Sequence, residues 1–292
     1  MSDGRVRMER DESTGIARLT LDNPERRNAY DPKMREQLGA YLDELAMDDG
    51  IKVVLLRGSG GVFSSGADMA NAYSWYGSGA TKGDAGGRPK KRPSQRRRLS
   101  VDRKTFDFYH NFLGYPKVIV AEVRGFALGG GFEMALMADI SVVGRKTQVG
   151  MPATRFLGPA LGSLHMFFYR LGPTLTRRFL LTGDTMAAEK LEHLSIFTEV
   201  VDDEKVEARA DWWARKASRM PADGIVIAKE AFRLVEQLQG YQGEEVASYL
   251  FHAYGTNLQF EPDEFNFVKT RSQLGTREAL RARDEHFDIP EP

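Results

Sequence analysis

The stretch AEVRGFALGGGFEMALMADI, residues 121–140, decides the fold of this chain. With the apolar letters VIV that precede it, it predicts a buried strand over residues 118–123. The glycine-rich residues 125–131 predict a turn, and they are followed by a short helix over residues 132–137 and another strand over residues 140–143. A strand, a turn, a helix and a strand in this order are typical of an α/β protein.

The segments before this stretch follow the same rhythm. IARLTL at residues 16–21 and VVLL at residues 53–56 predict strands, because each is rich in apolar residues and is bounded by turn signals. Between them, residues 31–47 have apolar side chains at helical spacing, with Asp31 as the expected N-cap. The second strand leads into another glycine-containing turn, FSSGADM at residues 63–69. The sequence therefore contains two glycine turns, each placed after a buried strand.

We expect a core over residues 1–200 and a helical region over residues 201–292. A glycine-rich loop near the end of the core leads into helices expected at residues 165–171 and 176–181. The last third shows helical spacing, for example in PADGIVIAKEAF at residues 221–232. The predicted fold class is thus an α/β body with a layer of helices at its C-terminal end.

The composition excludes several classes of protein. The chain has 292 residues, with 41 Lys and Arg, 41 Asp and Glu, and no cysteine. Without cysteine there is no disulfide scaffold, thiolate nucleophile, zinc ribbon or iron–sulfur site, which indicates a reducing, cytoplasmic location. A hydrophobic fraction of 41% excludes disorder over the whole chain. No apolar run reaches the roughly 20 residues of a membrane span, and the polar start predicts no secretion signal.

The two glycine turns suggest a shared chemical role. Glycine lets the backbone approach a ligand closely, and the start of a helix presents N–H groups that have no acceptor inside the helix. Two such N–H groups converging on one oxygen would stabilise an enolate or a thioester oxyanion. A purely structural turn is the alternative. The turns lack the GxGxxG spacing of a dinucleotide site, the Gly-Lys-Ser/Thr of a Walker A loop and the GxSxG of a nucleophile elbow.

Taken together, these stretches resemble the crotonase superfamily of enoyl-CoA hydratases and isomerases. The resemblance rests on FSSGADM, on the stretch quoted first, and on VGMPATRFLG and LLTGD downstream, and it runs from about residue 16 to residue 201. It implies a crotonase-like spiral of ββα units whose C-terminal helices assemble trimers or hexamers, the latter as dimers of trimers. It also implies an acyl-CoA thioester substrate, with coenzyme A as part of the substrate and no other cofactor.

Position by position, the resemblance assigns roles to particular residues. It places the oxyanion hole at the backbone N–H groups of Ala67 and Gly130, and it makes Glu133, one turn into the helix, the proton-transfer group. The segments that hold the adenine and pantetheine parts of coenzyme A correspond to residues 27–29 and 65–69. The binding residues implied are Arg27, Ala29, Ser65, Ala67, Asp68, Met69, Gly129, Gly130 and Pro152.

The sequence departs from the family where hydratases carry a second glutamate. Their segment usually reads GxPExxLG, and its glutamate works with the first to hold and activate a water molecule. Here the residue after Pro152 is Ala153, and an alignment shifted by one puts Thr154 there. The aspartate that dienoyl-CoA isomerases carry a little further on is also missing from PALGS at residues 159–163. Reactions that need both carboxylates are therefore disfavoured.

Two polar residues near this gap have open roles. Arg155 is either a group that holds an anion, such as a substrate carboxylate, or a surface or interface charge. His165 stands in the apolar stretch LHMFFY and is interpreted as a satisfied core or interface histidine. No metal site is expected, because the histidines show no HxxxH-type spacing; they are residues 110, 165, 193, 252 and 286.

The densest basic segment is RPKKRPSQRRRLSVDRK at residues 88–104, with nine Lys and Arg and one Asp. The rest of the chain holds 32 basic and 40 acidic residues, so the neutral total hides a body of net charge −8. Because residues 77–104 are poor in large apolar side chains, we expect a mobile surface insertion there. Nucleic acid is not an expected partner, since no aromatic residue is interleaved for stacking. The arginines either form a solvated face or reach the phosphates of coenzyme A or an acidic patch of another subunit.

Three functions stay open on the sequence alone. The first is an enzyme of the enoyl-CoA hydratase/isomerase class in which Glu133 alone transfers protons. The second is a hydrolase or C–C lyase that uses the same enolate chemistry on a β-oxo or β-hydroxy acyl-CoA. The third is a catalytically silent protein that binds CoA esters.

Overall fold

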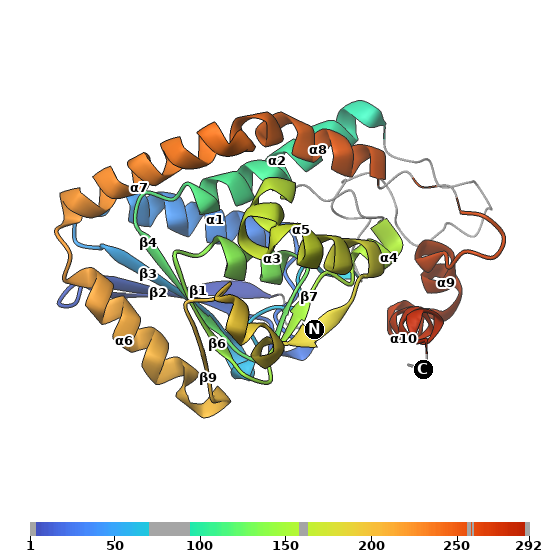
Figure 1. Ribbon diagram of the computed structural model, residues 1–292, viewed down its shortest axis with the longest axis horizontal. Coiled ribbons are helices and arrows are strands. Elements are labelled where there is room, and N and C mark those ends of the chain that lie inside the picture. The colour runs from blue at the N-terminus through green and yellow to red at the C-terminus, as the bar shows by residue number, and fades with distance from the viewer. Residues whose placement is uncertain (1–3, 70–93, 158–162, 256–257, 259, 290–292) are drawn as a thin grey trace.

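The computed structural model describes residues 4–69, 94–157, 163–255, 258 and 260–289 (Figure 1). Within these residues the main sheet has six strands in the order β1-β2-β3-β4-β6-β9. β1 is antiparallel to β2, and the other neighbours are parallel. The strands are β1 (Arg5–Asp11), β2 (Ile16–Asp22), β3 (Val53–Gly58), β4 (Val118–Val123), β6 (Ile140–Gly144) and β9 (Glu199–Val201).

The central strands are buried on both faces, as their continuous apolar sequences predict. Alternate residues of β3 pack against opposite layers of helix, because side chains of a strand point to its two faces in turn. Val54 belongs to the core that includes α1 (Pro32–Ala46) and α2 (Gln95–Leu113). Val53 belongs to the core on the other face, which α6 (Val206–Ser218) covers (Figure 1).

Helix α2 corrects the prediction for the basic segment. Of the mobile insertion predicted over residues 77–104, residues 77–93 lie outside the described residues, but residues 95–104 are helical and are not a mobile insertion. Ser94 caps the helix, its hydroxyl accepting a hydrogen bond from Arg97 N at 3.3 Å. The composition of residues 95–104 does not predict the first half of this helix, because the buried aromatic side chains that hold α2 against the core lie in its second half.

A second sheet, of three strands in the order β5-β7-β8, supports the loops that follow the main sheet. β5 is parallel to β7, and β7 is antiparallel to β8. Its strands are β5 (Phe126–Leu128), β7 (Gln148–Gly150) and β8 (Thr185–Ala187). The sequence does not predict these strands, because each has only three residues, nor β1, which fully buries only Val6.

The helices between the two sheets complete the α/β body. α3 (Gly130–Met137) is buried along its whole length. α5 (Leu164–Thr182) breaks at Gly172, where φ is 68°, so it consists of the two helices predicted at residues 165–171 and 176–181. The shorter helices are α4 (Thr154–Leu157), η1 (Pro24–Arg26), η2 (Ser59–Gly61), η5 (Ala188–Leu194) and η6 (Asp203–Lys205).

Helices also make up the chain after β9. Beyond α6 these are α7 (Ala222–Glu236), the π-helical turn η7 (Gln237–Tyr241), α8 (Gln242–Gly255), α9 (Phe267–Leu274) and α10 (Thr276–Phe287). α7 and α8 form a long arm across one side of the molecule, and α8 lies along α2 (Figure 1). None of the helices that the structure describes combines the length and apolar character required to cross a membrane.

Candidate active site

The two glycine turns lie against each other. A parallel bridge pairs Ser64 of the first turn with Ala127 of the second, which spans residues 125–131. Gly66 is so close to the second turn that a methyl group on it would lie 2.6 Å from Leu128 O and 3.2 Å from Gly130 N. Its φ of 88° is also in the left-handed region, so glycine is required here on both grounds.

The N–H groups of Ala67 and Gly130 have no acceptor within the described residues. Gly130 is the first residue of α3, so its N–H has no partner inside that helix. The N–H groups of the adjacent residues Asp68 and Gly129, in contrast, both donate hydrogen bonds to backbone carbonyl groups. The touching turns thus present two unbonded N–H donors at one place.

Tyr30 and Tyr109 support both turns, a role that sequence reasoning missed. Their hydroxyl groups are buried and hydrogen-bonded to each other. A Cβ atom at Gly130 would collide with both hydroxyls, which therefore lie directly against its Cα. Tyr30 N also donates to Gly66 O at 3.0 Å, so this residue contacts both turns. Burial raises the pKa of each phenol, and the nearby charge of Glu133 adds to this, so both tyrosines stay protonated.

Glu133 lies one turn into α3 and is only 6% exposed. Burial raises the pKa of its carboxyl group from 4.5 to about 7, against smaller effects of Ser163 and His252 that lower it. Ser163 Oγ lies beside the carboxyl group, although it makes no hydrogen bond of ordinary geometry within the described residues. A carboxyl group that titrates near neutrality can both accept and donate a proton.

The sequence matches the family model of enoyl-CoA hydratase/isomerase over residues 11–274. The chain belongs to this family. Among its relatives, the 1,2-epoxyphenylacetyl-CoA isomerase of Escherichia coli K12 is 28% identical over 76% of this chain and 80% of that protein. The 2,3-dehydroadipyl-CoA hydratase of the same organism is 27% identical over 75% of this chain and 79% of that protein.

Solved structures confirm the predicted fold of the family. The crystal structure of an enoyl-CoA hydratase/isomerase from Xanthobacter autotrophicus Py2 matches this chain with a TM-score of 0.81 and 26% identity. The match covers 99% of this chain and all of the other chain. The chain therefore has the crotonase-like α/β fold with a C-terminal helical region, as the resemblance implied.

The segment that carries the second glutamate in hydratases of this family has a structural role here. Ala153 packs against the small cluster formed by Phe267 of α9 and Ala279 of α10. Thr154 is buried, and its hydroxyl donates to Met151 O at 3.1 Å. Neither side chain can take a proton from water at neutral pH, so this segment supplies no second acid–base group.

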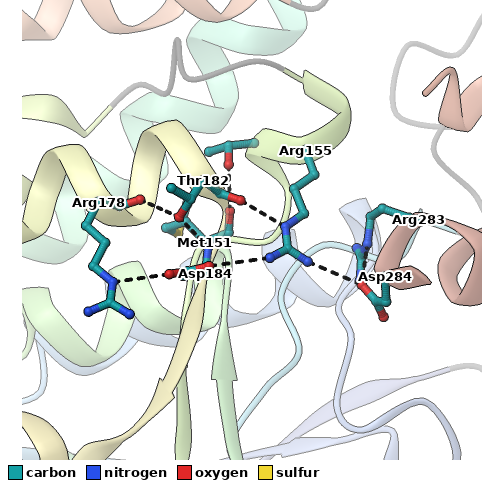
Figure 2. A network of polar contacts seen from close by, with 8 residues as sticks. Met151, Arg155, Arg178, Thr182, Asp184, Arg283 and Asp284 are labelled. Carbon is teal, nitrogen blue, oxygen red and sulfur yellow. Dashed lines mark hydrogen bonds and ion pairs between the residues drawn. The ribbon is translucent and has the colours of Figure 1, made fainter. Parts of the chain in front are cut away.

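Arg155 is held by structural partners (Figure 2). Its Nε donates to Thr182 O at 3.0 Å, and its guanidinium group lies 3.6 Å from carboxylate oxygens of both Asp184 and Asp284. The residue thereby joins α4 to the end of α5 and to α10. Of the two roles considered for Arg155, these contacts favour a structural charge over an anion-binding group.

His165 packs as predicted, but its ring is not hydrogen-bonded. The ring stacks on Tyr169 at 5.9 Å and contacts Tyr241 at 5.7 Å between centroids. Both ring nitrogens are buried without a partner among the described residues, and burial lowers the pKa of the ring. The expectation of a satisfied histidine is therefore wrong for hydrogen bonding and right for packing.

The residues expected to hold the adenine end of coenzyme A form a tight turn beside the first glycine turn. Arg27 has a φ of 52° and places its guanidinium group 4.7 Å above the ring of Phe126. Ala29 is buried, and its N–H donates to Arg26 O at 3.0 Å. Ser65 N donates to Arg27 O at 2.9 Å, which ties the two segments together. Their role in binding coenzyme A stays a prediction.

The other expected binding residues sit close by, and some already have partners. Asp68 forms an ion pair with Arg26 at 2.5 Å. Met69 is partly buried against α9, and its carbonyl accepts a hydrogen bond from Arg271 at 2.5 Å. Pro152 lies two residues before the start of α4. Within the described ranges, no group of three or more His, Cys, Asp or Glu side chains is arranged to hold a metal ion.

Proposed function

We propose that this protein is an acyl-CoA enzyme that stabilises a thioester enolate at the N–H groups of Ala67 and Gly130 and moves a proton with Glu133. One observation carries the proposal. The touching turns place two unbonded N–H donors beside a helix whose buried carboxyl group has a pKa of about 7. Each donor of such a hole contributes about 3 to 4 kcal/mol to transition-state stabilisation in enzymes where it has been removed.

The substrate class follows from the family and not from the site alone. One relative is named an isomerase and another a hydratase, and both names specify a CoA ester. We therefore infer a CoA thioester substrate, with no cofactor beyond its coenzyme A. The turn at residues 27–29 and the segment 65–69, tied together by the bond from Ser65 N, would hold the adenine and pantetheine parts.

The test of the site is Glu133→Gln, assayed on a panel of enoyl-CoA esters. The amide fills the same space and cannot transfer the proton, so we expect turnover to be lost while CoA-ester binding, measured by calorimetry, survives. Glu122→Gln is the matched control, because Glu122 of β4 is also buried but pairs with Arg124. It should retain turnover once the folded fraction is taken into account. Normal turnover by Glu133→Gln would refute the assigned role.

Product analysis separates the reactions that share this enolate. Mass spectrometry on a CoA-ester panel would show a gain of one water for hydration and no change of mass for isomerisation. Free coenzyme A or a shortened acyl chain would instead support the hydrolase or C–C lyase. Thioester binding without any product would support the silent binding protein, against which the buried, titratable Glu133 argues.

We propose that the C-terminal helices assemble a trimer or a dimer of trimers. α7 and η7 expose large apolar side chains, with Ile227 69% and Leu238 80% accessible in the single chain. Exposed apolar surface of this kind marks protein interfaces. Light scattering should give a trimeric or hexameric mass, which Ile227→Asp should reduce. A monomeric wild-type protein would contradict the assembly.

A further inference from the structure

Helix α8 presents polar side chains to the protein and apolar ones to the outside. Glu244, Ser248 and His252 recur every fourth residue and so share one side of the helix. Ser248 is 1% exposed, and the other two are partly buried. Apart from Gln242 at its start, the exposed large side chains of the same helix are Val246, Leu250, Phe251 and Tyr254. Ala253 is also buried on this helix, but an ordinary surface helix keeps its charged side chains on the outside, so the partly buried carboxyl group of Glu244 is unusual.

The inner side of α8 meets the first turn of α5. Glu244 Oε2 accepts a hydrogen bond from His165 N at 2.7 Å. Ser163, the N-cap residue of α5, does not cap the helix with its own side chain; its hydroxyl lies beside Glu133 instead. The carboxyl groups of Glu133 and Glu244 therefore both lie near the N-terminal end of α5. Glu133 lies beside Ser163, and Glu244 is bonded to His165 N.

Two buried hydroxyl groups at this place lack hydrogen-bond partners among the described residues. They belong to Ser163 and Ser248, which are 2% and 1% exposed. Buried hydroxyl groups in folded proteins are nearly always bonded, to protein or to ordered water. Ser163 lies beside Glu133, and Ser248 lies one turn along α8 from Glu244. Each carboxyl group thus has a spare hydroxyl nearby that could hold a water molecule or a substrate oxygen.

We propose that Glu244 is the second acid–base group of the active site and does the work of the glutamate that is missing after Pro152. The inference rests on the proposed function, because it needs an acyl-CoA held at Ala67 and Gly130. It restores the two-carboxylate chemistry that the sequence alone disfavours. The group comes from the C-terminal helical region, far from the segment that supplies it in hydratases of the family.

The surroundings of Glu244 suit this role. Burial is the main cause that raises its pKa to about 8; the charge of Glu133 also raises the pKa, and the bond from His165 N lowers it. Other titratable or charged groups on the packed elements include Tyr241 of η7, Glu245 and His252 of α8, His165 of α5, and Arg98, Asp102 and His110 of α2. Two interacting carboxyl groups with pKa values near neutrality titrate as a pair and hold one proton over an intermediate pH range.

The singly protonated pair can add water to an enoyl thioester with every proton balanced. The carboxylate takes a proton from water as the water oxygen bonds to the β-carbon. The π electrons of the C=C bond move into the enolate that the two N–H groups stabilise. The carboxylic acid then gives its proton to the α-carbon, and the thioester carbonyl re-forms. The pair ends with one proton, as it began.

Glu244→Gln tests the proposal. The amide oxygen can still accept the hydrogen bond from His165 N, so the start of α5 keeps its cap. We expect kcat for hydration of a four-carbon trans-2-enoyl-CoA to fall about 100-fold or more, with KM little changed. We expect the pH profile of kcat to be bell-shaped in the wild-type protein and to lose one limb in Glu244→Gln. Glu245→Gln removes a carboxyl group from the next position of α8 and should keep both the rate and the profile.

A second readout separates this inference from the proposed function. Exchange of the α-protons of butyryl-CoA in D2O needs only Glu133 and the oxyanion hole, so Glu244→Gln should retain it and Glu133→Gln should lose it. Wild-type hydration rate and both pH limbs in Glu244→Gln would overturn the inference and leave Glu133 in place. Exchange without hydration by the wild-type protein would overturn it as well. Absence of exchange in the wild-type protein would overturn the proposed function and this inference with it.

Discussion

The hydroxyl groups of Tyr30 and Tyr109 meet against the Cα atom of Gly130, where they are hydrogen-bonded to each other and leave no space for a side chain. Gly130→Ala should therefore displace the N–H donor of Gly130 and lower kcat/KM by about 100-fold or more, the cost of losing one oxyanion-hole donor. Gly224→Ala on α7 is the control, because its new methyl group meets only Pro221 Cβ, at 3.7 Å. Steady-state kinetics on both variants make the comparison. Equal activity of the two would show that Gly130 has no special position.

The hydrogen bond between the two tyrosines should stabilise the fold as well as the site. Tyr109→Phe removes a buried hydroxyl and its bond to Tyr30, so we expect the free energy of unfolding to fall by about 1 to 2 kcal/mol. Urea titration measures this change. Tyr249→Phe, in the partly buried surroundings of α8, provides a comparison for loss of a phenol hydroxyl outside the pair. A smaller loss for Tyr109→Phe than for Tyr249→Phe would contradict the importance of the pair.

The raised pKa of Glu133 predicts how stability depends on pH. Because the pKa is about 7 in the folded protein and 4.5 is its usual value, the folded state binds more protons between these values. Stability from this group is thus fully present below pH 4.5 and is lost as pH rises through 7. Glu133→Gln cannot ionise, so it should gain up to about 3 kcal/mol relative to wild type by alkaline pH.

Urea unfolding of wild type and Glu133→Gln across this pH range would check the prediction. Groups that do not interact with Glu133 contribute to both proteins and largely cancel in the difference. Glu244 does not cancel, because the charge of Glu133 raises its pKa in wild type only, and this adds to the loss of stability at alkaline pH in wild type. A difference in unfolding free energy that does not change with pH would mean that the carboxyl group of Glu133 is not desolvated.

Arg155 should matter for stability and not for substrate binding. Arg155→Ala removes its bonds to Thr182, Asp184 and Asp284, and we expect a loss of about 1 to 2 kcal/mol in unfolding free energy, since the side chain is mostly buried. Arg178→Ala is the control, because Arg178 pairs with the same Asp184 from a more exposed position and should cost less than about 1 kcal/mol (Figure 2). If Arg155→Ala were as stable as wild type but bound CoA esters more weakly, Arg155 would be an anion-binding residue and this prediction would be wrong.

The sequence predicts the long, buried helices and strands well. It predicts poorly the short or exposed strands that are held in place by residues far away in the sequence. The sequence predicts β4 over its observed residues, because its apolar run is continuous and ends at a turn. β1 is not predicted, because most of its residues are charged and it lies at the edge of the sheet. β5, β7 and β8 are only three residues long and are fixed by their partners in space.

The same distinction holds for the site. Motif spacing locates the two glycine turns and Glu133, because these residues lie close together along two short stretches. Glu244 could not be found this way, since a helix is expected to bury its apolar side chains and α8 exposes Leu250 and Phe251. Tyr30 and Tyr109 meet across 79 positions of sequence and carry no local signal.

The central claim is that the N–H groups of Ala67 and Gly130 polarise a thioester carbonyl, and infrared spectroscopy tests it most directly. The measurement is the stretching frequency of the thioester carbonyl in an acyl-CoA carrying ¹³C at that carbon, bound to the inactive Glu133→Gln variant and free in water. Hydrogen bonds from two preorganised donors weaken the C=O bond, so we predict a lower frequency in the complex than in water. A bound carbonyl that absorbs at or above its frequency in water would contradict the account.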